Sequence, residues 1–378
     1  MTPAVLPYGR QSIDDSDIAA VTEVLRGDWL TTGPAVDRFE TALAEWTGGV
    51  PCVSVTSGTA ALHVAYAAAG IGPGTEVITS PMTFVATAAT AAQLGGTVVF
   101  ADVEDDTVTL DPGAAAAAVS PRTRAITAVD YAGHPAEYDA LRKVADDSGT
   151  VLVADAAHSI GSRYRDVPTG AVADLTTFSF FPTKTVTTAE GGAVAVRDPA
   201  VLEAARRFRN HGLVRDTALQ RWPDEGGWHQ EVHAFGLNYR LPDVLCALGA
   251  SQLRRLGGFI ARRAALVRRY NELLADVPGL RLPVTRGHVE PSWHLYAVRI
   301  LGGRRREVYE QMRAAGIGVQ VNYIPADWHP VFADLGYRRG MCPVAEAFYA
   351  EQLSLPLFPD LTEADQDRVV DVLRGILS

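Results

Sequence analysis

Lysine is the residue type that stands out in this sequence, because only two of the 378 residues are lysines, against 32 arginines. A lysine in apolar surroundings can lose its proton and attack a carbonyl carbon, whereas an arginine stays protonated. Lys143 lies on the charged face of a helix-like pattern, where we expect a solvated side chain. Lys184 follows a strand-like segment and a turn marked by Pro182. Lys184 is therefore the candidate for amine chemistry, and the alternative is a loop lysine that points into water.

A carboxylate, Asp155, ends the apolar segment 150–154. Ligands of open α/β sheets bind outside the carboxyl ends of strands, although an isolated aspartate there is as often a helix cap. Pyridoxal phosphate requires a Schiff-base lysine and a separate acid that keeps its pyridine nitrogen protonated. Lys184 and Asp155 together therefore predict this cofactor.

A seat for the cofactor's phosphate is predicted where a strand-like segment turns into a helix at Ser57, Gly58 and Thr59. Glycine allows the backbone to approach an anion, and the first helical N–H groups and both hydroxyls would face it. Alone, this segment could be a simple helix cap. Ser179 would add a hydroxyl, and Phe84 could stack on a flat ring, although a single phenylalanine is usually a core residue. Dinucleotide, nucleotide-triphosphate and metal-ligand motifs are absent from the sequence, so we expect no metal site.

Short apolar runs alternate with helix-like stretches between residues 51 and 197. The predicted strands are 52–56, 76–80, 97–102, 124–130, 150–155, 175–180 and 192–197. The predicted helices between them are 60–69, 83–94, 112–119 and 136–148. This alternation predicts an α/β fold with a mixed, mostly parallel sheet and helices on both faces.

The pattern changes after residue 197. Residues 213–235 are polar and rich in tryptophan and glycine, which predicts a long loop, and residues 241–277 form one long helical pattern. Strands at 294–301 and 318–321 and helices at 304–315, 343–352 and 362–377 are predicted to follow. We therefore expect two domains: residues 1–240, an N-terminal segment with the large cofactor-binding α/β domain, and residues 241–378, a smaller α+β domain.

The composition indicates which binding partners and which cellular compartment to expect for this protein. The formal net charge is −10 and no tract of basic residues occurs, which argues against nucleic acid or an anionic membrane as a partner. Residues 1–7 have no signal-peptide pattern, and the most apolar long stretch, 83–101, is interrupted by Gln and Gly. Three widely spaced cysteines, Cys52, Cys246 and Cys342, predict neither disulfides nor a zinc site. We expect a soluble, cytoplasmic protein.

Several ordered motifs together resemble the DegT/StrS family of pyridoxal-phosphate sugar-nucleotide aminotransferases. The motifs are at residues 56–62, 155–161, 178–180 and 184–192, and the similarity extends to 29–34, 209–212, 236–241, 294–296 and 321–325. The resemblance implies the aspartate-aminotransferase fold, which is fold type I of pyridoxal-phosphate enzymes. It also implies a homodimer whose active sites lie at the subunit interface.

The resemblance assigns roles to individual residues. Lys184 would carry the Schiff base, Asp155 would bind the pyridine nitrogen, and His158 would lie beside the ring near its phenolic oxygen. The other implied cofactor-binding residues are Ser57, Gly58, Thr59, Phe84, Ser179 and, from the neighbouring subunit, Asn238. The implied sugar-nucleotide site consists of Tyr8, Trp29, Leu30, Thr31, Asn322 and Tyr323.

The expected reaction moves an amino group from L-glutamate to a nucleotide-linked 4-keto-6-deoxy sugar. Residues 130–133 and 187–192 are similar to the C4-aminating branch of the family, which includes the aminotransferase of pseudaminic acid synthesis. A 3-keto sugar nucleotide or a keto-cyclitol of an antibiotic pathway remains an alternative acceptor. Arg240 and His211 are candidates for the glutamate carboxylates. The alternatives of other classes are a regulator that binds the cofactor without catalysis and an unrelated α/β fold with a structural lysine.

Overall fold

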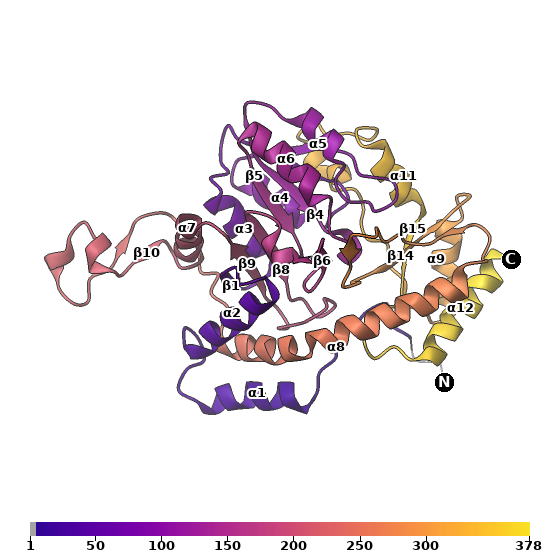
Figure 1. Ribbon diagram of the computed structural model, residues 1–378, viewed down its shortest axis with the longest axis horizontal. Helices are drawn as coiled ribbons and strands as arrows, with labels where there is room; N and C mark the ends of the chain where they lie inside the picture. The colour runs from indigo at the N-terminus through magenta and orange to yellow at the C-terminus, as the bar shows by residue number, and fades with distance from the viewer. Residues whose placement is uncertain (1–4) are drawn as a thin grey trace.

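A mixed sheet of seven strands positions the predicted site residues in the computed structural model, which describes residues 5–378 (Figure 1). Its order is β1-β9-β8-β5-β4-β2-β3, and only β9 runs antiparallel to its neighbours. The strands are β1 (Cys52–Val55), β2 (Glu76–Thr79), β3 (Thr97–Phe100), β4 (Thr123–Val129), β5 (Val151–Asp155), β8 (Leu175–Ser179) and β9 (Gly192–Val196). All seven predicted strands are confirmed to within two residues at each end.

Helices cover both faces of this sheet, which explains why its strands are apolar on both sides. One face packs against α3 (Gly58–Ala68), α4 (Ala86–Gln93) and α7 (Pro199–Arg209). The other packs against α5 (Pro112–Ala118) and α6 (Tyr138–Ser148), and, toward β1, against α2 (Pro34–Trp46). Successive residues of β5 face opposite sides of the sheet: Val153 belongs to the core on the first face and Leu152 to the core on the second. The predicted α/β class is confirmed.

A single long helix, α8 (Asp243–Leu274), connects this region to the C-terminal elements. Its first half packs against α1 (Asp15–Arg26) and α2, and its second half enters a separate core (Figure 1). That core is built on a three-stranded sheet of β12 (Leu280–Arg281), β14 (Tyr296–Ile300) and β15 (Gln352–Leu355). The flanking helices are α9 (Arg305–Ala314), α11 (Pro343–Glu351) and α12 (Glu363–Leu377).

The predicted strand 318–321 is wrong. This segment pairs only through single bridges, of Ile317 with Leu6 and of Gln320 with Ser354. The Gly318 N–H donates to the Leu6 carbonyl at 2.7 Å, and a Cβ at Gly318 would lie 2.8 Å from the same oxygen. The N-terminal segment therefore runs beside residues 316–318 as a single parallel bridge, which does not extend into a ladder. Strand β15, which the sequence analysis missed, takes the place in the sheet beside β14.

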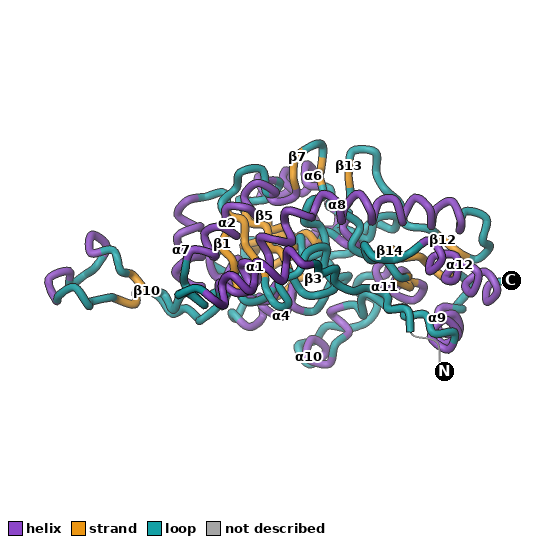
Figure 2. The backbone as a smooth tube through the Cα atoms, turned by 90° about the horizontal axis from the view of Figure 1, so that it is seen from below, coloured by secondary structure: helices purple, strands orange, loops and turns teal. Residues whose placement is uncertain are grey.

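The segment between α7 and α8 projects from the rest of the chain as an arm (Figures 1 and 2). We define the arm as residues 213–235, which contain the short strands β10 (Leu213–Val214) and β11 (Glu231–Val232). The Glu231 carboxylate holds the arm together by accepting hydrogen bonds from two backbone N–H groups and from His229 and His233. The predicted long loop is thus a hairpin with its own polar centre.

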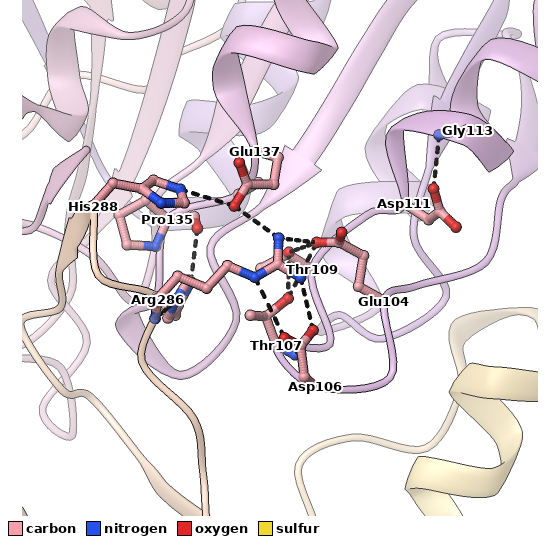
Figure 3. Close-up of polar contacts among 12 residues, drawn as sticks. Glu104, Asp106, Thr107, Thr109, Asp111, Gly113, Pro135, Glu137, Arg286 and His288 are labelled. Atoms are coloured by element: carbon pink, nitrogen blue, oxygen red, sulfur yellow. Dashed lines mark hydrogen bonds and ion pairs between the residues drawn. The ribbon is translucent and has the colours of Figure 1, made fainter. Parts of the chain in front are cut away.

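An arginine ties the segment before β14 to the large sheet (Figure 3). Arg286 lies 3.1 Å from Glu104, 2.8 Å from Asp106 and 2.8 Å from Glu137. His288 lies 3.0 Å from the same Glu137 carboxylate. Burial alone would raise the pKa values of Asp106 and Glu137, but both are lowered by Arg286, together with His288 at Glu137 and backbone N–H groups at Asp106. This Arg286 network fixes the path of the chain that leads to the site.

The structure also bears on the predictions about membrane spans, metal ligands and cysteines. Met1 to Ala4, part of the segment from which no signal peptide is expected, lie outside the described residues. Within residues 5–378 there is no helix with the length and apolar character needed to cross a membrane. The same residues include no group of three potential metal ligands close enough to hold an ion. All three cysteines are buried and free.

Candidate active site

A cavity of about 520 Å³ opens where strands β1, β5 and β8 end. These strands are parallel to one another, so the segments that follow them meet at one edge of the sheet. The cavity brings together most of the residues that the sequence predicted: Tyr8, Ser57, Gly58, Thr59, Phe84, Asp155, His158, Ser179, Lys184, Asn322 and Tyr323.

Lys184 lies in the loop that joins β8 to β9. Hydrogen bonds from the Thr187 hydroxyl and the Thr188 N–H to the Phe180 carbonyl, both 3.0 Å, close this loop at its base. Burial lowers the pKa of Lys184 to about 8, and the nearby Asp155 carboxylate opposes part of this effect. Lys143, in contrast, is exposed on α6 and pairs with Asp147 at 2.7 Å, as expected for a solvated lysine.

Asp155 is the last residue of β5 and is buried beneath the cavity. The Thr87 hydroxyl donates to one carboxylate oxygen at 2.6 Å, and the Ala157 N–H donates to the other at 3.2 Å. Burial raises the pKa of Asp155, although these two donors and the charge of Lys184 oppose the rise. The site therefore favours a further positive group next to this carboxylate, such as a protonated ring nitrogen.

His158 lies three residues beyond Asp155 and is also buried. Its Nε2 is 2.9 Å from the Tyr323 hydroxyl, whereas its Nδ1 is buried without a hydrogen-bond partner among residues 5–378. Burial holds the pKa of His158 well below its ordinary value, and the charge of Lys184 lowers it further. The imidazole is therefore neutral, with one nitrogen free for a ligand.

His294 is a cavity residue to which the sequence analysis gave no role. Its ring centre lies 4.4 Å from that of His158, and burial likewise lowers its pKa. The buried Arg263 of α8 donates to the carbonyl groups of Trp293, His294 and Leu357, at 3.2, 3.3 and 3.1 Å. The sequence offered only the motif around His294 and no signal of its contact with His158, because the fold alone brings these distant segments together.

The predicted phosphate seat is formed where β1 gives way to α3. The Ser57 hydroxyl accepts a hydrogen bond from the Ala60 N–H at 3.0 Å and so caps the helix. The N–H groups of Gly58 and Thr59, at the start of this helix, have no partner within it and are available to an anion. A Cβ at Gly58 would lie 2.7 Å from the Ser179 Cβ, so glycine is needed for the two segments to meet. These donors fit the phosphate of the predicted cofactor.

Phe84 is 58% exposed, although it lines the cavity. Its ring centre lies 6.0 Å from that of Tyr323, with the two ring planes at 64°. An aromatic side chain exposed at a cavity wall is suited to packing against a flat ligand.

Four predicted residues lie outside this cavity in the single chain. Trp29 and Leu30 are 58% and 52% exposed, and Thr31 and Asn238 are exposed as well. The glutamate candidates Arg240 and His211 also lie outside the lining, and Arg240 donates to the Asn210 side chain at 2.6 Å. The assignments of all these residues remain predictions.

Comparison with known proteins identifies the family of this chain. The family model of the DegT/DnrJ/EryC1/StrS aminotransferases matches residues 11–374. The chain belongs to this family. Its curated relatives include the spore coat polysaccharide biosynthesis protein SpsC of Bacillus subtilis, which is 37% identical over 378 residues that cover 98% of this chain and 97% of that protein.

Solved structures of similar chains agree with the assignment. The PLP form of Spr1654 from Streptococcus pneumoniae matches with a TM-score of 0.92 and 28% identity and covers 98% of both chains. PseC of Helicobacter pylori, an aminotransferase involved in the biosynthesis of pseudoaminic acid, matches with a TM-score of 0.91 and 29% identity and covers 99% of both chains. The predicted type I fold is confirmed, and the chain is a pyridoxal-phosphate-dependent sugar aminotransferase. This family assignment favours neither the non-catalytic regulator nor the unrelated fold.

Proposed function

We propose that this enzyme transfers the amino group of L-glutamate to a nucleotide-linked 4-keto-6-deoxy sugar and gives a 4-amino sugar nucleotide. The observation that carries the proposal is the presence of Lys184, with its lowered pKa, and the buried Asp155 in one cavity. When bound there, pyridoxal phosphate supplies an electron-withdrawing ring that stabilises negative charge on the Cα of the amino donor.

Lys184 would act first as the covalent anchor of the cofactor and then as the proton carrier. With a pKa of about 8, a substantial share of its Nζ is neutral near neutral pH. Once displaced by the amine of L-glutamate, Nζ removes the Cα proton as a general base and holds it for return as a general acid. Its position in the lining of the cavity supports both roles.

The other cavity residues would hold the cofactor in place. Asp155 would keep the ring nitrogen protonated through a charge-assisted hydrogen bond, with Thr87 fixing the carboxylate. His158 would donate to the phenolic oxygen. The phosphate would bind to Ser57, Gly58, Thr59 and Ser179, and Phe84 would stack on the ring.

The acceptor site is proposed on the wall formed by Tyr8, Asn322 and Tyr323. The side-chain oxygen of Asn322 is buried and has no partner among residues 5–378, so it can accept a hydrogen bond from a sugar hydroxyl. The similarity over 99% of both chains to PseC, an aminotransferase involved in pseudoaminic acid biosynthesis, supports the C4-aminating branch that residues 130–133 and 187–192 resemble. Trp29, Leu30 and Thr31 would extend this site toward the nucleotide.

We propose that the enzyme works as a homodimer whose subunits share their sites. Lys184 is the only lysine or arginine that lines the cavity within residues 5–378, yet the substrates and cofactor carry several anionic groups. Asn238 and the arm lie away from the cavity of their own subunit, and Phe235 is 98% exposed. These features support an arrangement in which Asn238 reaches the phosphate bound by the other subunit.

The test is an assay of the purified holoenzyme with L-glutamate and a panel of nucleotide-linked 4-keto and 3-keto hexoses and keto-cyclitols. We expect 2-oxoglutarate and a 4-amino sugar to form together, and no turnover by the control variant Lys184→Arg. Turnover of only the 3-keto sugars or cyclitols would overturn the choice of acceptor. Conversion of none of these compounds, in spite of bound cofactor, would overturn the proposed reaction.

A further inference from the structure

Three residues of the cavity lining, His158, His294 and Tyr323, lie together with the buried Tyr131, which is not part of the lining. The ring centre of His158 lies 4.4 Å from that of His294 and 6.4 Å from that of Tyr131. Tyr323 reaches His158 from the C-terminal region, with its hydroxyl 2.9 Å from Nε2 and its ring stacked at 5.9 Å. The charged groups that face His158 are Lys184 and, at the end of the preceding strand, Asp155.

The protonation states of this pair leave two possible directions for its hydrogen bond. Burial lowers the pKa of His158 well below its ordinary value, so the ring carries a single N–H. Burial also raises the pKa of Tyr323, so the hydroxyl keeps its proton. Either the Tyr323 hydroxyl donates to Nε2 and the ring proton is on Nδ1, or Nε2–H donates to the Tyr323 oxygen.

The two directions differ in how many buried polar groups of His158 and Tyr323 they leave without a hydrogen-bond partner. If the hydroxyl donates to Nε2, the only unsatisfied group is the Nδ1–H, which is buried. In the reverse case the hydroxyl proton and the Nδ1 lone pair are both unsatisfied, because neither group makes another hydrogen bond of normal length among residues 5–378. Each buried polar group without a partner costs free energy, so the first arrangement is favoured.

We propose that Tyr323 is a positioning residue that fixes the Nδ1–H tautomer of His158, and that this N–H donates to an oxygen of the bound ligand. Within the proposed function, on which this ligand assignment rests, the acceptor is the phenolic oxygen of pyridoxal phosphate. His294 and Tyr131 pack next to the imidazole, while Tyr323 sets which nitrogen carries the proton. The second neighbour of a histidine commonly selects its tautomer in this way.

The tautomer can be measured directly with histidine labelled by nitrogen-15, in both the cofactor-free protein and the holoenzyme. The signals of His158 are assigned by their loss in the variant His158→Gln. In the wild type we expect Nδ1 to carry the proton and Nε2 to be an unprotonated acceptor. Tyr323→Phe keeps the stacked ring and removes the hydroxyl, and we expect it to give a mixture of the two tautomers.

Tyr131→Phe is the matched control, because it removes another buried hydroxyl beside His158, one that donates to the Asn322 carbonyl instead. We expect this variant to keep the wild-type nitrogen pattern. Protonation at Nε2 in the wild type, or an unchanged pattern in Tyr323→Phe, would overturn the proposal. The wild-type measurement alone is decisive if Tyr323→Phe does not fold.

The holoenzyme gives an independent readout. Loss of the donor at the phenolic oxygen is expected to shift the pH midpoint of the cofactor's visible absorbance upward in Tyr323→Phe. The rate of the half-reaction with L-glutamate should fall about tenfold, as expected for one hydrogen bond, while the Kd for L-glutamate stays within about twofold. An unchanged midpoint and rate would contradict the role toward the cofactor. If the enzyme transaminates while His158 carries its proton on Nε2, only this inference is refuted. If His158 has the expected tautomer but the protein binds no cofactor, only the proposed function is refuted.

Discussion

Lys184 is expected to lose its proton near pH 8 in the cofactor-free protein, far below the pH at which Lys143 does so. Burial in the cavity lowers the pKa of Lys184 to about 8. The hydrogen bond and charge of Asp147 raise the pKa of the exposed Lys143 above its ordinary value. Because the chain has no other lysine, each one serves as the internal reference for the other.

The size of the difference follows from these values. At pH 8, about half of the Lys184 side chains are neutral, whereas a lysine with a pKa of 10.5 is only about 0.3% neutral. The neutral fraction of Lys184 is therefore expected to exceed that of Lys143 by at least about 150-fold at this pH. A small amine-reactive anhydride should modify Lys184 preferentially from pH 7 to 9, provided that it enters the cavity.

The assay is the pH dependence of the labelling rate at each lysine, read by peptide mass mapping. Asp155→Asn sharpens the test, because the Asp155 carboxylate raises the pKa of Lys184 and its removal should move the midpoint further down. Lys143→Arg should leave the midpoint of Lys184 unchanged. A midpoint for Lys184 at or above that of Lys143 would refute the electrostatic reasoning, and an upward shift in Asp155→Asn would refute the assigned sign.

Three further variants test other parts of the site and fold. Thr87→Val removes the 2.6 Å hydrogen bond to Asp155 and should lower kcat about 10- to 100-fold, measured with L-glutamate and the preferred acceptor. Gly58→Ala places a Cβ 2.7 Å from the Ser179 Cβ and should weaken cofactor binding about tenfold, measured by absorbance titration. Arg286→Ala should destabilise the fold by about 1–3 kcal/mol in denaturant unfolding at pH 7. The last effect should shrink below about pH 4, because carboxylates with lowered pKa values contribute stability above their unfolded pKa and lose it as the pH falls.

Each of the three variants has a matched control, which distinguishes its specific effect from a general loss of stability or folding. Thr90→Val alters another buried threonine of α4, whose hydroxyl bonds only to the Ala86 carbonyl, and should retain kcat within about threefold. Gly258→Ala adds a methyl group where nothing lies within 4 Å and should leave cofactor affinity unchanged. Arg165→Ala removes an exposed ion pair and should cost less than about 1 kcal/mol. Equal losses in a variant and its control would contradict the specific role assigned to the variant.

The sequence predicted the parts of the fold that depend on local pattern. The seven strands of the large sheet are short apolar runs bounded by turn residues, so their positions could be predicted to within two residues. The placement of Asp155 and Lys184 at one edge of the sheet could be predicted because Asp155 ends a strand, Lys184 follows another, and parallel strands bring their carboxyl ends together. The scarcity of lysine then left only one candidate for the nucleophile.

Features that depend on contacts between distant segments could not be predicted in this way. Residues 318–321 have an alternating pattern typical of a strand, but this segment pairs with the N-terminal segment and with Ser354 only through single bridges. The contact of His294 with His158 and the hydrogen bond between Tyr323 and His158 depend on how the C-terminal region docks. Trp29 and Asn238 are exposed outside the cavity of a single chain, so their predicted roles depend on the proposed second subunit.

The most direct test of the central claim is chemical trapping of the resting holoenzyme. Borohydride reduction fixes the cofactor to the amine that holds it, and digestion followed by mass spectrometry identifies the modified lysine. The account predicts the adduct on Lys184 and none on Lys143, with about one cofactor per chain. An adduct on Lys143, or a holoenzyme with no reducible lysine adduct, would contradict it.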